Sequence, residues 1–215
     1  MNKIINKDNI SSWILFGLSL LIAGLFIGSL PDEIPIHFNI NGTIDNYGNK
    51  FMIFLMPLTM FVMLLGSTLA KNKEKQSKTS DKYYYQIVFL SNIVIILLEI
   101  YIIAVSFEIK VMNAMNLALI LVGVLIVVIG NVMPKFGQGK WIGVRTKWTL
   151  ADETVWFHTH RFCAKLWFVG GILFVGTVFL KGIPKTVSVI AIAFILTLLP
   201  ILYSKVEYEK LANRG

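Results

Sequence analysis

The sequence predicts an all-α integral membrane protein with about six transmembrane helices, both termini in the cytoplasm and a small extracellular hairpin between the first two helices. Apolar residues make up 56% of the 215 residues, whereas soluble domains have about 45–50%. They gather into runs of roughly the 20 residues that a helix needs to cross a bilayer. The basic residues gather between alternate runs. This composition excludes an ordinary soluble domain.

Six apolar runs are candidate membrane spans. Every backbone amide in lipid needs an internal partner, so these runs are expected to be helices and not strands. No small-residue cleavage site follows the first run, which indicates a retained helix and not a signal peptide. The fifth run is short. The runs cover residues 12–30, 51–70, 86–107, 114–132, 166–180 and 187–203.

The distribution of lysine and arginine predicts the direction of the spans. Sixteen of the 20 basic residues lie in the two terminal tails and in the second and fourth loops. An excess of basic residues marks the cytoplasmic side of a membrane. The asymmetry therefore predicts that both termini of this multi-pass protein of the cell membrane lie in the cytoplasm. It also accounts for the net charge of +8 through contact with membrane lipids, without direct binding of nucleic acid.

The chain is expected to divide into three parts. Residues 1–70 would form a two-helix unit with an extracellular loop at 31–50. Residues 71–85 are polar and charged, as in a flexible cytoplasmic linker. Residues 86–215 would form a four-helix unit with a cytoplasmic loop at 133–165.

The extracellular loop has the pattern of a β-hairpin. Asn41-Gly42 tolerates the positive φ of a two-residue turn, and apolar residues alternate before it. With this turn, His37 would lie on the face opposite Asp45, so the two would not form an obvious catalytic pair. Two interpretations are open: a cap on the helix bundle, or a ligand-facing surface. That surface would consist of His37, Asn41, Gly42, Asp45 and Tyr47.

The cytoplasmic loop is rich in aromatic and basic residues. Thr149 followed by Asp152 resembles a capping box, so a helix is expected to begin at Leu150. His158 and His160 would point about 200° apart on that helix, whereas metal-binding helices use a spacing of four. We therefore expect neither a metal site nor a cofactor.

Arginines in the same loop suit the recognition of anions. Arg145 and Arg161 are planar bidentate donors that fit carboxylates or lipid phosphates. The tryptophans of the loop could equally be interfacial anchors. The residues of interest are Asn131, Gly143, Arg145, Thr146, Trp148, Trp156, His160 and Arg161.

At these two loops the chain resembles the SdpI family, bacterial membrane proteins that confer immunity to a secreted killing peptide. Two positions depart from the family pattern: Lys147 stands where members usually carry Pro, and Gly139 where they carry Asn. The extracellular loop resembles the family's N-terminal domain in Ile34-Pro35-Ile36-His37, Asn41-Gly42, Asp45, Tyr47 and Lys50. The cytoplasmic loop resembles the C-terminal signature in Gly130-Asn131, Gly143-Val144-Arg145-Thr146, Trp148-Thr149-Leu150, Trp156 and Thr159-His160-Arg161.

The resemblance implies a function that the composition does not reveal. It implies non-enzymatic protection against a secreted antimicrobial peptide, with that peptide toxin as a partner. In some members it also implies signalling, in which a cytoplasmic transcriptional repressor is captured at the membrane.

A small transporter or channel is the alternative function, because Glu99 lies inside the third apolar run. A charged carboxylate there costs about 2.5–3.5 kcal/mol on insertion scales. The structural alternative is a protonated Glu99 that hydrogen-bonds to Asn92 or Ser91, or to a neighbouring helix. An enzyme is not expected, since the sequence has no GxSxG, HExxH or paired acidic motif in the membrane.

Overall fold

The computed structural model describes residues 5–73, 78–139 and 142–213, and these are mostly helical. Within them, five helices are long and apolar enough to cross a membrane. This confirms the predicted all-α membrane architecture in its coarse form. These helices are α2 (Leu55–Lys73, preceded by the 3₁₀ turn η1, Lys50–Phe54), α3 (Lys78–Ser106), α4 (Ala114–Val132), α6 (Glu153–Gly176) and α7 (Gly182–Ala212).

The first helix is shorter than the other five. Helix α1 (Ile10–Phe26) is apolar and has 17 residues, which gives a length of about 26 Å against a hydrocarbon core of about 30 Å. Six spans therefore stay a prediction. The cytoplasmic position of the termini and the extracellular position of the hairpin also stay predictions, because the helices alone do not fix the direction in which they cross a membrane.

Several helices extend beyond the predicted runs. Helix α2 continues to Lys73 and α3 begins at Lys78, so helix occupies much of the predicted linker at 71–85. Helix α6 begins well before residue 166 and ends at Gly176, where the 3₁₀ turn η3 (Thr177–Phe179) follows. Polar residues can continue a helix outside the apolar core of the bilayer, and a hydropathy pattern does not mark where they stop.

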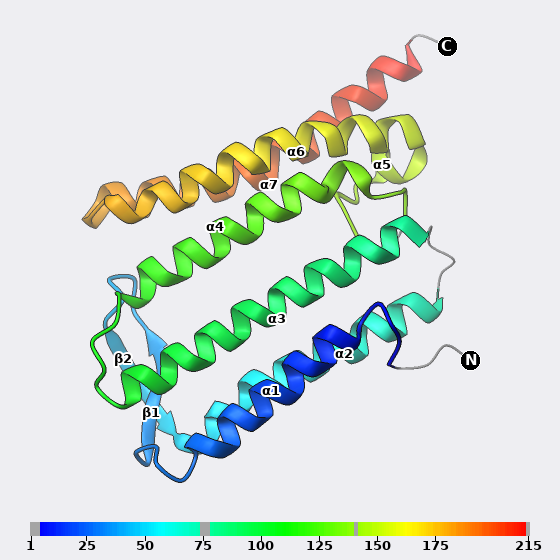
Figure 1. Cartoon of the computed structure of the whole chain (residues 1–215). Helices are drawn as coiled ribbons and strands as arrows, with labels where there is room; N and C mark the ends of the chain where they lie inside the picture. The colour runs from blue at the N-terminus through cyan, green and yellow to red at the C-terminus, as the bar shows by residue number, and fades with distance from the viewer. Residues whose placement is uncertain (1–4, 74–77, 140–141, 214–215) are drawn as a thin grey trace. The chain divides into compact units, whose positions relative to one another are not determined.

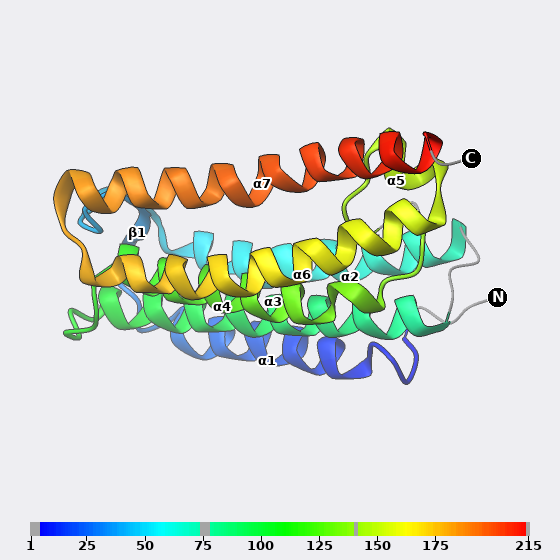
Figure 2. The same ribbon diagram turned by 90° about the horizontal axis from the view of Figure 1, so that it is seen from above.

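The chain divides into two compact units. The first comprises Met1–Lys75 and Tyr85–Ala118, and the second comprises Gln76–Tyr84 and Leu119–Gly215. In the second unit, α6 runs beside α7 in both views (Figures 1 and 2). The three-part division expected from the sequence stays a prediction.

A small apolar core supports the hairpin within the first unit. Ala23 of α1, Ile53 of η1 and Ile103 of α3 are buried together with Leu30 and Ile34. Because Ile34 lies on the first strand, this cluster fixes the base of the hairpin to the ends of α1 and α3 and to the 3₁₀ turn η1.

The hairpin itself is antiparallel, with β1 (Glu33–Phe38) paired to β2 (Ile44–Asn49). The predicted two-residue turn at Asn41-Gly42 is wrong. The N–H of Asn39 donates to the carbonyl of Thr43 at 2.9 Å, and the N–H of Gly42 donates to the carbonyl of Asn39 at 2.8 Å. These bonds close a loop of residues 40–42 in which Gly42 has φ +74°, as three-residue hairpin loops require.

The strand register corrects a second expectation. His37 pairs with Asn46 but Phe38 pairs with Ile44, so Asp45 is an extra residue in a bulge. Bulges re-aim side chains. Here Nδ1 of His37 lies 2.5 Å from Oδ1 of Asp45, so the expectation that these residues lie on opposite faces is wrong.

Candidate functional site

The tip of the hairpin is held in place by Asn113, the residue before α4. Its side-chain amide donates to the carbonyl of Asn41 at 2.7 Å, and its Oδ1 accepts from the N–H of Met115 at 3.0 Å. A Cβ atom at Gly42 would collide with the Asn113 side chain. Gly42 is therefore required by its backbone angle and by the close approach of Asn113.

Asn39 organises the turn from inside. Its Oδ1 accepts from the N–H of Asn41 at 2.9 Å and from that of Thr43 at 3.2 Å, while its Nδ2 donates to Oγ1 of Thr43 at 2.5 Å. Sequence reasoning missed Asn39 and Asn113. The signal for Asn39 was the Asn at the start of a turn, where its side chain commonly accepts bonds from the next residues.

The base of the hairpin is closed by an ion pair. Nζ of Lys50 donates to Oδ1 of Asp32 at 2.9 Å. The hydrogen bond and the positive charge of Lys50 lower the pKa of Asp32 below its usual value. Phe38, at the end of β1 nearest the turn, packs against the Tyr101 ring of α3, with ring centroids 5.8 Å apart.

The predicted toxin-facing residues therefore form an ordered and exposed surface. The side chains of His37 and Asp45 are 66% and 41% exposed, and Tyr47 is 52% exposed. Asn41 is also exposed. Gly42 differs from the others because it shapes the tip and offers no side chain.

In the second unit, the segment before α6 forms a short helix of its own. Thr146 caps α5 (Lys147–Ala151) and forms a capping box with Thr149. Asp152 then caps α6, with its side chain accepting from the N–H of Val155 at 2.9 Å. The predicted helix start at Leu150 is wrong, because Thr149 pairs backward with Thr146 and leaves Asp152 to begin a new helix.

A buried Trp156–His160 stack lies at the centre of this region. Both side chains are fully buried, with ring centroids 4.1 Å apart. Nε1 of Trp156 donates to the carbonyl of Phe136 at 2.8 Å. Nδ1 of His160 donates to the carbonyl of Trp156 at 2.8 Å, and Nε2 accepts from the N–H of Val144 at 3.1 Å.

These contacts assign His160 a structural role. Its two ring nitrogens are both engaged, with the hydrogen on Nδ1, so neither has a lone pair for a metal ion. His158 instead pairs with Glu207 at 2.7 Å. In the part of the chain that the structure describes, no group of three or more His, Cys, Asp or Glu side chains could hold a metal ion.

Gly143 allows the loop to approach the stack. It has φ +105°, and a Cβ atom there would collide with Nε2 of His160 and lie 3.0 Å from the Trp156 ring. Two further bonds hold the following residues: Oγ1 of Thr149 donates to the carbonyl of Val144 at 2.8 Å, and Thr146 Oγ1 lies 2.9 Å from Ser204 Oγ on α7.

The remaining predicted residues of this loop are peripheral to the stack. Trp148 lies under Nζ of Lys147, 5.1 Å from the ring centroid, and Asn131 is exposed near the end of α4. Arg145 and Arg161 are exposed. Neither guanidinium has a hydrogen bond or ion pair with a residue that the structure describes.

Glu99 lies in α3 of the first unit and is fully buried. It accepts a hydrogen bond of 2.6 Å from Oγ of Ser19 on α1. Its Oε1 and both polar atoms of the buried Asn92 have no partner in the described part of the chain. The sequence left three partners open for Glu99: Asn92, Ser91 or a neighbouring helix. The hydrogen bond comes from a neighbouring helix, α1, through Ser19.

Comparisons with known proteins cover both regions. A family described as "SdpI/YfhL protein family" matches residues 135–204, and a domain of unknown function (DUF1648) matches residues 14–61. The chain is 29% identical to "Immunity protein SdpI" of Bacillus subtilis (strain 168) over 205 residues, which cover 95% of this chain and 98% of that protein. No solved structure matches the chain. The predicted resemblance is confirmed.

Proposed function

The chain is related to the SdpI family, and from that premise we propose that it is a membrane immunity protein. It would protect the bacterium that carries it against a secreted antimicrobial peptide, without catalysing a reaction. The observation that carries this proposal is the similarity to "Immunity protein SdpI" over 95% of the chain. That similarity spans both the hairpin and the Trp156–His160 stack.

Expression in a sensitive bacterium tests the proposal. Cells that express the chain should survive killing peptides secreted by competing bacteria, and cells with an empty vector should die. The variant Gly143→Asp, which forces a charged side chain against the buried stack, serves as the inactive control. Equal killing of expressing and non-expressing cells by every peptide tried would contradict immunity.

We further propose six spans with both termini in the cytoplasm and the hairpin outside. The distribution of basic residues supports this orientation. Reporter fusions at Lys75, at Lys140 and at the C-terminus should report the cytoplasm, whereas fusions at Asn41 and Lys110 should report the outside. A cytoplasmic Asn41 would overturn the orientation.

In this orientation the hairpin is the toxin-facing surface. Its exposed side chains are His37, Asn41, Asp45 and Tyr47. Asn113 fixes the tip at Asn41, and His37 and Asp45 hold each other through their own contact. A surface that is ordered before binding loses less conformational entropy when the toxin binds. In this orientation the hairpin also lies where a peptide outside the cell could reach it.

The loop at Arg145 is a candidate for signalling on the inner side. Arg145 is exposed, and its neighbours Val144 and Thr146 are fixed by the bonds to His160 and Ser204. A guanidinium that has no partner among the described residues suits a carboxylate of a cytoplasmic protein, such as a transcriptional repressor. Toxin-dependent recruitment of a labelled cytoplasmic partner to the membrane would test this role.

A transporter or channel is the second candidate. It is favoured by Oε1 of the buried Glu99, which has no hydrogen-bond partner among the residues that the structure describes. Ionisable groups inside membranes often mark ion or substrate paths. Counter-flow uptake by liposomes that contain the chain separates the two functions. Toxin protection without uptake supports immunity, whereas uptake that disappears in Glu99→Gln supports transport.

A further inference from the structure

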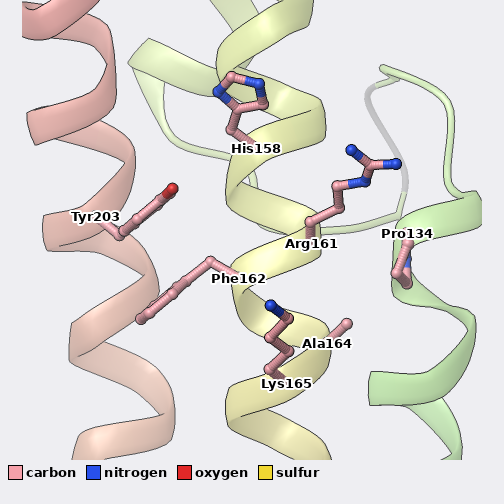
Figure 3. Close-up of a pocket in the computed structure, with 7 residues that line it drawn as sticks. All are labelled: Pro134, His158, Arg161, Phe162, Ala164, Lys165 and Tyr203. Carbon is pink, nitrogen blue, oxygen red and sulfur yellow. The ribbon is translucent and has the colours of Figure 1, made fainter.

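A pocket of about 640 Å³ lies against α6 in the second unit, and neither the Trp156–His160 stack nor the hairpin accounts for it. Its lining residues on α6 recur at spacings of three and four, so they share one helical face. Pro134 of η2 (Met133–Lys135) and Tyr203 of α7 flank that face (Figure 3). The lining residues are Pro134, His158, Arg161, Phe162, Ala164, Lys165 and Tyr203.

The pocket presents two cations that nothing in the described chain neutralises. Arg161 and Lys165 are one helical turn apart, and both are exposed. Neither forms an ion pair with a described residue. The nearby carboxylate of Glu207 is already paired with His158 at 2.7 Å. Two exposed positive charges, one helical turn apart, are therefore available to an external anion.

The other wall of the pocket is aromatic. The rings of Phe162 and Tyr203 stack with centroids 4.3 Å apart and an interplanar angle of 3°. In Figure 3, Phe162 turns toward Tyr203, whereas Arg161 lies on the side of Pro134. The pocket thus combines the bidentate guanidinium of Arg161 and the ammonium of Lys165 with an aromatic wall.

The surroundings of the pocket are those of a membrane boundary. Lys165 immediately precedes the fifth predicted span and Tyr203 ends the sixth. From the pocket toward the middle of these spans, the surface is apolar and exposed, with Phe168 at 46% and Leu199 at 38%. A ligand that fits must be anionic at one end and apolar at the other.

We propose that this pocket binds the phosphate headgroup of an anionic phospholipid. Arg161 would hold two phosphate oxygens through its fork, Lys165 would add a second positive charge, and the Phe162–Tyr203 wall would pack against the glycerol and upper acyl chain. Basic pockets between transmembrane helices are known to select such headgroups. Arg161 then differs from Arg145, which lies in the loop before α5 and does not line the pocket.

Native mass spectrometry of the purified full chain in detergent tests the proposal. The probes are dioctanoyl phosphatidylglycerol, dioctanoyl phosphatidylcholine and inorganic phosphate. The wild-type chain should retain phosphatidylglycerol in preference to phosphatidylcholine. Arg161→Gln and Lys165→Gln should each weaken that retention about fivefold, and the double variant about thirtyfold.

The control removes the same number of charges outside the pocket. Lys205→Gln with Lys210→Gln changes two exposed lysines of α7 and should leave retention unchanged. Arg161→Lys keeps the positive charge but loses the bidentate guanidinium. Its retention of phosphatidylglycerol should lie between that of the wild-type chain and that of Arg161→Gln. A circular dichroism spectrum identical to that of the wild-type chain would exclude misfolding.

Three results would overturn the proposal. The first is equal retention of the anionic and zwitterionic lipids. The second is an unchanged affinity in the folded Arg161→Gln/Lys165→Gln variant. The third is displacement of the lipid by inorganic phosphate at an equal concentration, which would identify a free-phosphate site without any contribution from the glycerol or acyl chain.

Discussion

The Nε2 atom of His160 accepts a hydrogen bond from the backbone N–H of Val144 across 16 positions of the chain. This contact closes the loop between α4 and α6 onto the buried Trp156. Since Nδ1 of the same ring donates to the carbonyl of Trp156, the imidazole connects helix and loop through both nitrogens. Gly143, beside Val144, leaves the space that this contact needs.

Gly143→Ala should therefore destabilise the second unit. The added Cβ would collide with His160, and the residue would be strained at φ +105°. We expect a loss of about 1–3 kcal/mol in the free energy of unfolding, measured by denaturant titration in detergent with tryptophan fluorescence. Gly176→Ala, where a Cβ meets nothing within 4 Å, is the matched control and should not be destabilising. Equal unfolding midpoints for the two variants would contradict this account.

Gly42→Val should reduce protection without affecting insertion. A β-branched residue at φ +74° is strained, and its Cβ would push Asn113 away from the carbonyl of Asn41. The expected strain is about 1–3 kcal/mol, confined to the hairpin. Survival under toxin and membrane abundance would be measured together. Gly28→Val, at a glycine with open space around it, is the control. Full protection by Gly42→Val would mean that the loop is a passive connector.

The Asp32–Lys50 pair should make the base of the hairpin sensitive to acid. The pKa of Asp32 is lowered by the hydrogen bond and charge of Lys50. Its contribution is therefore present above the usual carboxyl pKa of 3.8 and is lost as the pH falls through the lower folded value. In Lys50→Gln the pKa of Asp32 should return toward 3.8, as an NMR titration of its side-chain carbon would measure. An unchanged titration would show that the pair does not form in solution.

Glu99→Gln should retain both expression and protection if Glu99 is protonated and structural. The amide oxygen of glutamine can still accept the hydrogen bond from Ser19. Ser19→Ala removes the donor instead, and should cost about 1–3 kcal/mol by leaving a buried acceptor without its partner. Protection assays and membrane abundance distinguish the outcomes. Loss of protection by Glu99→Gln at normal abundance would favour a titrating role and the transport hypothesis.

Arg145→Lys should weaken partner recruitment more than survival. Lysine preserves the charge and the topology but cannot make a bidentate contact with a carboxylate. We expect a reduction of about tenfold in toxin-dependent recruitment, equivalent to one charge-assisted hydrogen bond. Lys147→Arg, an exposed neighbour that keeps its charge, is the control. Wild-type recruitment in Arg145→Lys would mean that this arginine does not bind the partner.

Periodicity and hydropathy were enough to predict the helical membrane architecture, because long apolar runs have few alternatives in lipid. They could not predict where helices end beyond the apolar runs, as at α2, α3 and α7. The cap of α6 was also missed, because Thr149 can pair with either Thr146 or Asp152, and only the folded loop decides between them.

The two proposed sites were predicted in their residues but not in their geometry. The residues of the cytoplasmic motif included Trp156, His160 and Gly143, yet nothing in their spacing indicated that they meet in one buried stack. In the hairpin, a single extra residue reversed the relation between His37 and Asp45. Long-range partners such as Asn113 and Ser204 are invisible to a local pattern, since their contacts depend on tertiary folding.

The bulge at Asp45 has a consequence for how the hairpin can meet other chains. A regular two-stranded ribbon has open edges on which a further strand can be added, and such edges invite aggregation. Here the pairing is irregular on both sides of His37, which interrupts the row of backbone groups that a third strand needs. Copies crowded in a membrane are thus discouraged from joining edge to edge. A bound peptide would be recognised through the exposed side chains of the hairpin, and a rigid or cyclic peptide could bind as well as an extended one.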